Sequence, residues 1–177
     1  MKKVVFFTEK EKLPDALENF NIESFKNKKV PVKLHMGEIK NKFFLRPEFV
    51  GYVVKTIKKY DMDPFLFDTT VAYSGLRHSK KGYHKLAKLH GFTEKKVGCK
   101  VVIDDTGKNV KIENRDYEVA DHIYDSSYIF ALTHVKGHNA AGFGAAIKNF
   151  GMGGVTKETK IDIHNRSKPL YQKDKCT

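Results

Sequence analysis

The 177-residue sequence predicts an α/β fold with a mostly parallel sheet and helices on both faces, in a three-layer, Rossmann-like arrangement. Short runs of β-branched and aromatic residues alternate along the chain with stretches whose apolar residues recur at helical spacing. Strands separated by helices in this way form parallel sheets that are covered on both faces. The length and the hydrophobic content of 40% suit one domain with its own core. We therefore expect a single α/β domain over residues 1–165 and a polar tail over residues 166–177.

The order of elements can be read along the chain. The helix over residues 46–60 is the clearest, because Pro47 suits a first turn and an apolar stripe from Phe49 to Ile57 recurs at helical spacing. Residues 108–127 are less regular and fit a hairpin or a polar excursion, and the polar stretch from Thr156 onward gives no clear signal. The other predicted helices are residues 9–20, 79–92 and 139–151, and the predicted strands are residues 3–7, 29–37, 63–70, 100–104 and 127–135, the last of them central.

Composition narrows the classes of function. The formal charge is +12, but the lysines are spread along the chain and no helix-turn-helix, zinc-finger or RNA-binding signature accompanies them, so we do not expect nucleic-acid binding. No apolar run approaches the ~20 residues of a membrane helix. The apolar run Val4–Phe7 is also shorter than the ~7–15 residues of a signal-peptide core. We expect a cytoplasmic protein without a membrane partner.

Polar side chains follow several predicted strands at the point where each strand ends. His35, Asp68, Asp104 and His134 hold these positions. Ligands of open α/β sheets bind beyond the carboxyl ends of parallel strands, so a ligand site is expected at this edge. Each residue also has a purely structural interpretation: Asp68 as a helix cap or turn residue, His35 as a donor to one loop carbonyl, and Asp104 as part of the turn signal "DDTG".

The segment His134–Gly154, "HVKGHNAAGFGAAIKNFGMGG", is the densest in polar groups and contains six glycines. In a fully extended chain His134 and His138 would lie ~13 Å apart, too far to share one metal ion. A turn at Gly137 would bring them together. A divalent metal held by His35, His134 and His138 therefore depends on that turn.

The second half of the segment, residues 139–151, predicts a helix with one face of small residues. Strand, glycine-rich turn and helix is the layout of phosphate sites, yet neither the Walker loop nor the dinucleotide fingerprint is present. Free backbone N–H groups at the helix start, with Lys136 and Lys148 nearby, favour a small anionic ligand. The alternative is a glycine-rich helix packed tightly in the core.

At this point the residues resemble a known family. "KLHMGE", "RPEFV", "FLFDT", "AYSGLRHS" and the His134–Gly154 block occur in this order in the domain-of-unknown-function-362 family of iron–sulfur proteins. The resemblance implies an α/β domain followed by a ferredoxin-like domain that holds two [4Fe–4S] clusters. The family motif includes His35, Lys136, His138, Lys148 and Asn149, and assigns no reaction to them.

The ending "YQKDKCT" resembles the start of a ferredoxin cysteine run, with Cys176 as the first cluster ligand only in a longer chain. One thiolate cannot hold a cluster that needs four, so no cluster is expected on these 177 residues alone. A ferredoxin-like domain or another redox partner is the expected neighbour, and the basic charge would suit an acidic one.

Three hypotheses remain at this stage. The domain could hold a substrate or metal for a redox partner, it could be a non-redox enzyme in which a histidine acts as acid or base, or it could be a binding module without chemistry of its own. The candidate catalytic residues are His134, His138 and Lys136; the candidate ligand-binding residues are His35, Asp68, Gly137, Lys148 and Asn149.

Overall fold

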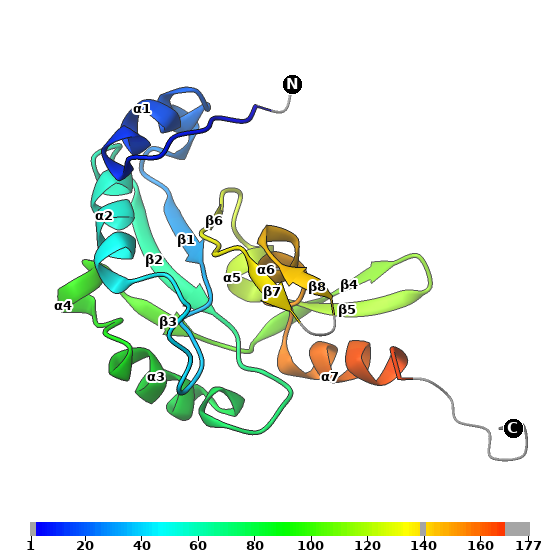
Figure 1. Cartoon of the computed structure of the whole chain (residues 1–177). Coiled ribbons are helices and arrows are strands. Elements are labelled where there is room, and N and C mark those ends of the chain that lie inside the picture. Colours follow the sequence, from blue (N-terminus) through cyan, green and yellow to red (C-terminus); the bar gives the residue numbers. More distant parts are fainter. Residues whose placement is uncertain (1–2, 139–140, 169–177) are drawn as a thin grey trace, which may run out of the picture.

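A computed structural model describes residues 3–138 and 141–168 of the chain. Its centre is a four-stranded parallel sheet in the order β3-β2-β1-β6 (Figure 1). The strands are β1 Lys29–Lys33, β2 Asp63–Asp68, β3 Val101–Ile103 and β6 Phe130–Ala131.

The strand order places a change of direction beside β1. From β1 the chain moves to β2 and then to β3 on one side, and it later returns to add β6 on the other side. The β1–β2 ladder runs from Lys29 opposite Asp63 to Lys33 opposite Phe67, whereas β6 pairs with β1 at two residues only. Such a switch point opens a crevice at the carboxyl ends of the two strands, where ligands of α/β sheets bind.

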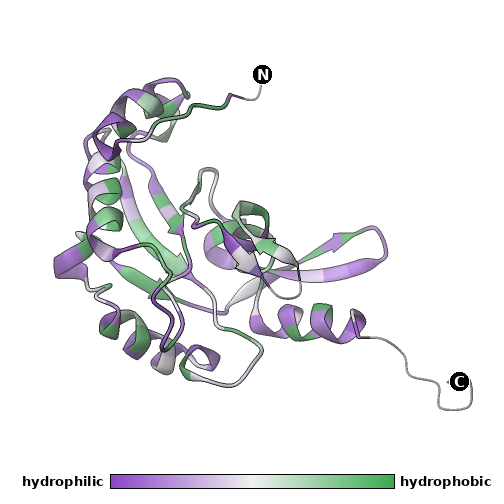
Figure 2. Ribbon diagram, viewed as in Figure 1, coloured by the Kyte–Doolittle hydropathy of each residue, from purple (hydrophilic) through white to green (hydrophobic). Residues whose placement is uncertain are grey.

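Apolar layers cover both faces of the sheet. Because successive strand residues point to opposite faces, Leu66 joins the large core while Phe65 and Phe67 join a smaller core behind the sheet. The large core is closed by helices α2 and α3, whose apolar sides face the strands (Figure 2). The helices on that side are α1 Leu13–Glu18, α2 Pro47–Lys58, α3 Lys80–Leu89 and α4 Glu94–Val97, and α5 Asp121–Tyr124 lies on the other side. The predicted three-layer α/β class is confirmed.

Beyond the sheet and these helices, the described residues form two hairpins, two further helices and three short 3-10 turns. Two hairpins are present: β4 Gly107–Ile112 with β5 Arg115–Ala120, and β7 Lys136–His138 with β8 Gly142–Gly144. The helices are α6 Ala146–Gly151 and α7 Lys157–Arg166. Short 3-10 turns η1 Lys10–Lys12, η2 Ile22–Phe25 and η3 Leu76–His78 complete the described chain. The hairpin interpretation of residues 108–127 is thus correct for its first part.

Two predicted strands differ from the structure. Residues 3–7 join no strand, and Val4 and Phe6 are exposed, because strand propensity acts only where a sheet offers a half-buried surface to fit. The predicted central strand over residues 127–135 is reduced to the two-residue edge strand β6. His134 therefore lies three residues past the end of its strand.

The predicted helix over residues 139–151 begins late. Gly142 has a φ of 71°, which a right-handed helix does not accept, and residues 142–144 form strand β8 instead. Helix α6 starts at Ala146 and ends at Gly151, as the glycine stop predicts. Gly137 lies inside β7 opposite Phe143 rather than at a turn. The helix start beside which an anion site is expected is therefore at Ala146, and the anion site itself stays a prediction.

Candidate functional site

A cavity of about 530 Å³ lies over the carboxyl ends of β1, β2 and β6, at the switch point of the sheet. It is lined by all eight of the residues proposed from the sequence as catalytic or ligand-binding: His35, Asp68, His134, Lys136, Gly137, His138, Lys148 and Asn149. A second cavity of about 350 Å³ includes none of them; it is lined by Lys28, Lys29, Phe65, Asp121, His122 and residues 125–128. The structure therefore brings the candidate residues together around one space.

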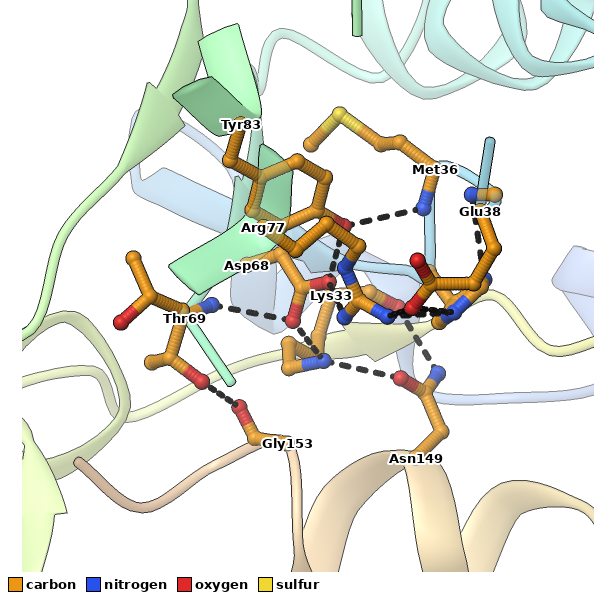
Figure 3. Close-up of polar contacts among 12 residues, drawn as sticks. Lys33, Met36, Glu38, Asp68, Thr69, Arg77, Tyr83, Asn149 and Gly153 are labelled. Carbon is orange, nitrogen blue, oxygen red and sulfur yellow. Dashed lines mark hydrogen bonds and ion pairs between the residues drawn. The ribbon is translucent and has the colours of Figure 1, made fainter. Parts of the chain in front are cut away.

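The floor of the cavity is a buried ion pair between the last residues of neighbouring strands. Lys33 ends β1 and Asp68 ends β2; the exposed fractions of the two side chains are 1% and 2%, and the Lys33 Nζ lies 2.7 Å from the Asp68 Oδ1 (Figure 3). Tyr83 donates its hydroxyl to the same carboxylate, and the Thr69 amide donates to it at 2.9 Å. Burial alone would raise the pKa of Asp68, but Lys33 and Arg77 lower it to about 2, so the carboxylate stays charged.

Arg77 joins this floor to the loop that follows β1. Its guanidinium is 6% exposed, contacts Asp68 at 3.3 Å and forms a further ion pair with Glu38. Tyr73 donates to the same Glu38 carboxylate, and burial raises the pKa of Tyr73 to about 12. Both carboxylates of the cavity are therefore engaged by Arg77, and only the Nε of Arg77 is buried without a hydrogen-bond partner among its polar atoms.

His35 is held as a neutral imidazole. The Arg77 Nη1 lies 2.7 Å from its Nε2, and the Gly37 amide donates to its Nδ1 at 3.1 Å. A guanidinium has no acceptor, so a doubly protonated ring would direct its two N–H groups at two donors. Burial, and then the charge of Arg77, lower the pKa of His35 well below its ordinary value.

Asn149 connects the two sides of the switch point. Its side-chain oxygen accepts from Lys33 Nζ at 2.9 Å, and its amide nitrogen donates to the Lys33 carbonyl, the Leu132 carbonyl and the Thr133 hydroxyl at 2.8–3.3 Å. Two of these contacts reach Lys33 at the end of β1, and the other two reach Leu132 and Thr133 directly after β6. Asn149 thus shapes the cavity wall through contacts within the protein.

Gly153, near the end of the His134–Gly154 block, has no side chain because the backbone passes close to Lys33 and Asn149 there. A Cβ on Gly153 would come within 2.5 Å of the Lys33 Nζ and 2.3 Å of the Asn149 carbonyl oxygen. The Gly153 carbonyl also accepts a hydrogen bond from Thr69 at 2.9 Å. Only a residue without a side chain lets the backbone approach the buried lysine this closely.

A second buried lysine comes from α7. Lys160 is 6% exposed and donates to the carbonyls of Thr70 at 2.7 Å and Val155 at 2.8 Å, and to the Thr69 hydroxyl. Burial lowers its pKa to about 8, against the opposing effect of Asp68. These contacts tie α7 to the loop after β2.

The rim of the cavity is basic. Lys136 lies in β7 and Lys148 in α6, and neither makes an ion pair within residues 3–138 and 141–168. Burial and the charge of Arg77 lower the pKa of Lys136. Burial and the neighbouring Lys148 and Lys136 lower the pKa of His138, whose Nδ1 accepts from the Ala141 amide at 3.2 Å. The described cavity lining holds five basic side chains and two carboxylates, which favours an anion.

The sequence interpretation missed four functional groups of this site. It assigns no role in the site to Lys33, Arg77, Tyr83 or Lys160. The available signal for Lys33 is a lysine that directly follows the apolar run Val30–Val32, inside the strand predicted over residues 29–37. For Lys160 no signal existed, because α7 was not predicted. Asp104 does not line the cavity: its carboxylate is taken by Lys80, Thr106 and the Asp105 amide, as the turn interpretation expects.

The donors do not form a metal centre within the described part of the chain. No group of three or more histidine, cysteine, aspartate or glutamate side chains is placed to hold an ion there. His35, His134 and His138 line one cavity, but the three side chains do not form a group that could hold a metal ion. Cys176 lies outside the described residues.

Residues 30–173 match the family described as a domain of unknown function, DUF362. The chain belongs to this family. The match covers the sheet, the cavity and the glycine-rich block, and it carries no statement of reaction or cofactor. Neither the comparison with curated proteins nor that with solved structures gave a match. Within the described residues of this DUF362 chain, no helix has both the length and the apolar character to cross a membrane.

Proposed function

We propose that this DUF362 domain binds a small anionic ligand over the carboxyl ends of β1, β2 and β6. The observation that carries the proposal is the cavity at the switch point, with buried cations in its floor and further cations at its rim. Position and charge agree, because α/β sheets bind ligands at this edge and a basic cavity concentrates anions.

The charges of the floor and the rim have different roles in this proposal. Lys33 and Arg77 are paired with Asp68 and Glu38, so the floor is rigid and close to neutral. Lys136 and Lys148 make no ion pair in the part of the chain that the structure describes. They are therefore the side chains proposed to contact the anion, each through a charge-assisted hydrogen bond.

His134 and His138 are proposed to supply the chemistry. Both line the cavity next to Lys136, and burial with the neighbouring lysines lowers the pKa of His138, which favours the neutral ring that a general base requires. Asp68 and Asn149 support the floor and wall of the site, and His35, whose pKa is lowered by burial and by Arg77, is proposed to contact the ligand directly.

A second and more specific part of the proposal concerns electron transfer to or from the bound ligand. We propose that a ferredoxin-like domain or separate partner with [4Fe–4S] clusters exchanges electrons with the ligand, and that Cys176 is the first cluster ligand in a longer chain. The support is the sequence resemblance and the charge of +12, which suits an acidic partner. Anaerobic reconstitution of a longer chain should yield iron and acid-labile sulfide that fall on Cys176→Ser; a longer chain that takes up neither contradicts this part.

Anion binding is tested by calorimetric titration of the 177-residue chain with inorganic phosphate and phenyl phosphate at fixed ionic strength. Lys136→Gln and Lys148→Gln should each weaken the affinity for the tighter anion about tenfold, the effect of one lost charge-assisted hydrogen bond. Lys111→Gln is the matched control, because Lys111 is an exposed lysine on β4 outside the cavity. An equal loss in all three variants would show only the effect of net charge and would contradict a site.

A further inference from the structure

The cavity has two unlike walls. One wall is formed by the loops that follow β1 and β2, and it combines a group of apolar side chains with the polar residues His35, Asn41, Thr69 and Tyr73. Its charged groups, Glu38 and Arg77, are paired with each other. The apolar lining of this wall comes from Phe44, Leu45, Val71 and Ala72.

The opposite wall is formed by the segment from β6 to α6. Its charged lining consists of Lys136 and Lys148, accompanied by His134 and His138, and no carboxylate from the described part of this segment joins them. In Figure 1, β7, β8 and α6 lie together on the side of β1 away from β3. Apart from Lys160 of α7, which donates to the Thr70 and Val155 carbonyls, the lysines of the described cavity lining that make no ion pair thus lie on this one wall.

We infer that the ligand has two parts: an aromatic or other apolar body, and an anionic group such as a phosphate or carboxylate at one end. The inference rests on the proposed anion site and adds the class of molecule that occupies it. The anionic end lies toward Lys136 and Lys148, and the apolar body lies against the wall that contains Phe44 and Leu45.

The size of the cavity supports a two-part ligand over an inorganic anion. At about 530 Å³ it has the volume of sites for small organic molecules, which are commonly ~300–1,000 Å³. An inorganic anion at the basic wall would leave the apolar wall in contact with water. An apolar body that fills this space removes both surfaces from water, and so gains affinity in addition to that of the charge.

The test compares probes that differ in one part. Inorganic phosphate, phenyl phosphate and phenol are titrated into the wild-type chain by calorimetry. We expect phenyl phosphate to bind about tenfold or more tightly than either of the others, because burial of the ring and pairing of the phosphate both contribute. This comparison needs no variant and is independent of folding defects.

Phe44→Ala then tests whether the wall that contains Phe44 contacts the apolar body of the ligand. We expect it to reduce the preference for phenyl phosphate over phosphate severalfold and to leave the affinity for inorganic phosphate unchanged. Phe43→Ala is the matched control, since Phe43 is the adjacent residue, is 74% exposed and does not line the cavity. Circular dichroism of both variants checks that they are folded.

The outcomes separate the two proposals. If inorganic phosphate and phenyl phosphate bind equally well, and both depend on Lys136, the anion site stands and the two-part ligand is wrong. If phenol binds as well as phenyl phosphate, or if no probe binds, the anion site itself fails. If Phe43→Ala and Phe44→Ala reduce the preference equally, the apolar wall is not the binding surface and the inference is overturned.

Discussion

Replacement of Asp68 by Asn should destabilise the fold more than any other single change in the cavity. The carboxylate is 2% exposed and faces two buried cations, Lys33 at 2.7 Å and Arg77 at 3.3 Å. Removing one partner of a buried ion pair leaves uncompensated charge and costs about 3–5 kcal/mol. Domains of this size have a free energy of unfolding of about 5–15 kcal/mol, so the variant should lie close to the limit of folding.

Urea unfolding followed by far-UV circular dichroism measures this effect. Lys33→Met should cost less than Asp68→Asn, because Asp68 then keeps Arg77 as a partner. In the double variant the two effects should fall short of their sum by about 1 kcal/mol or more, since the two side chains contact each other. Asp63→Asn is the control: Asp63 is an exposed carboxylate at the start of the same strand, and its replacement should change stability by less than about 0.5 kcal/mol.

The pH dependence gives an independent reading of the same carboxylate. The folded-state pKa of Asp68 is about 2, below the unfolded value of about 3.9, so its contribution is present above pH ~4 and is lost as the pH falls through 2. The wild type should lose about 2 kcal/mol relative to Asp68→Asn across that window. Purely additive variants, or a stability difference that does not change between pH 4 and 2, would refute the account of a charged, coupled pair.

Three further outcomes are expected. Gly153→Ala should cost about 1–3 kcal/mol, because its Cβ would meet Lys33 and the Asn149 carbonyl, whereas Gly151→Ala, with open space around it, should stay within about 0.5 kcal/mol; thermal unfolding compares the two. Asn149→Ala should cost about 1–3 kcal/mol by the same measurement, since it leaves buried partners unsatisfied. Lys160 has a folded pKa of about 8, below the ~10.4 of an unfolded lysine, so the unfolded chain binds more protons between these values and stability should rise with pH there. Urea titrations at pH 8 and 10 should show this rise in the wild type, and its persistence in Lys160→Met would contradict the assignment.

The sequence was sufficient to predict the layers and the edge at which the site lies. Helical spacing in residues 46–60 and the apolar strand before Asp68 depend on burial alone, and burial has a period that a sequence displays. Of the four polar residues expected at the strand ends, His35, Asp68 and His134 line one space, as parallel strands that end at the same edge predict, whereas Asp104 does not.

The parts that were missed depend on contacts distant in sequence. Lys33 can be buried because Asp68 neutralises its charge and Asn149 accepts a hydrogen bond from its ammonium group. The residues next to Lys33 in the sequence give no sign of partners so far along the chain. The start of α6 depends on the positive φ of Gly142, which glycine permits but does not require. Residues 3–7 have strand composition without a place in the sheet, which only the tertiary structure determines.

The Lys33–Asn149 contact spans 116 residues and fastens a strand pair that is only two residues long. A closure over that distance carries a large loss of chain entropy, so β1, β2 and β3 can assemble with α2 and α3 before the segment after β6 docks on them. The cavity would then be the last region to form during folding and the first to open in the native state. Amides of residues 130–138 and 141–151 should exchange with solvent faster than those of β1 and β2, by the same local opening that would admit a ligand.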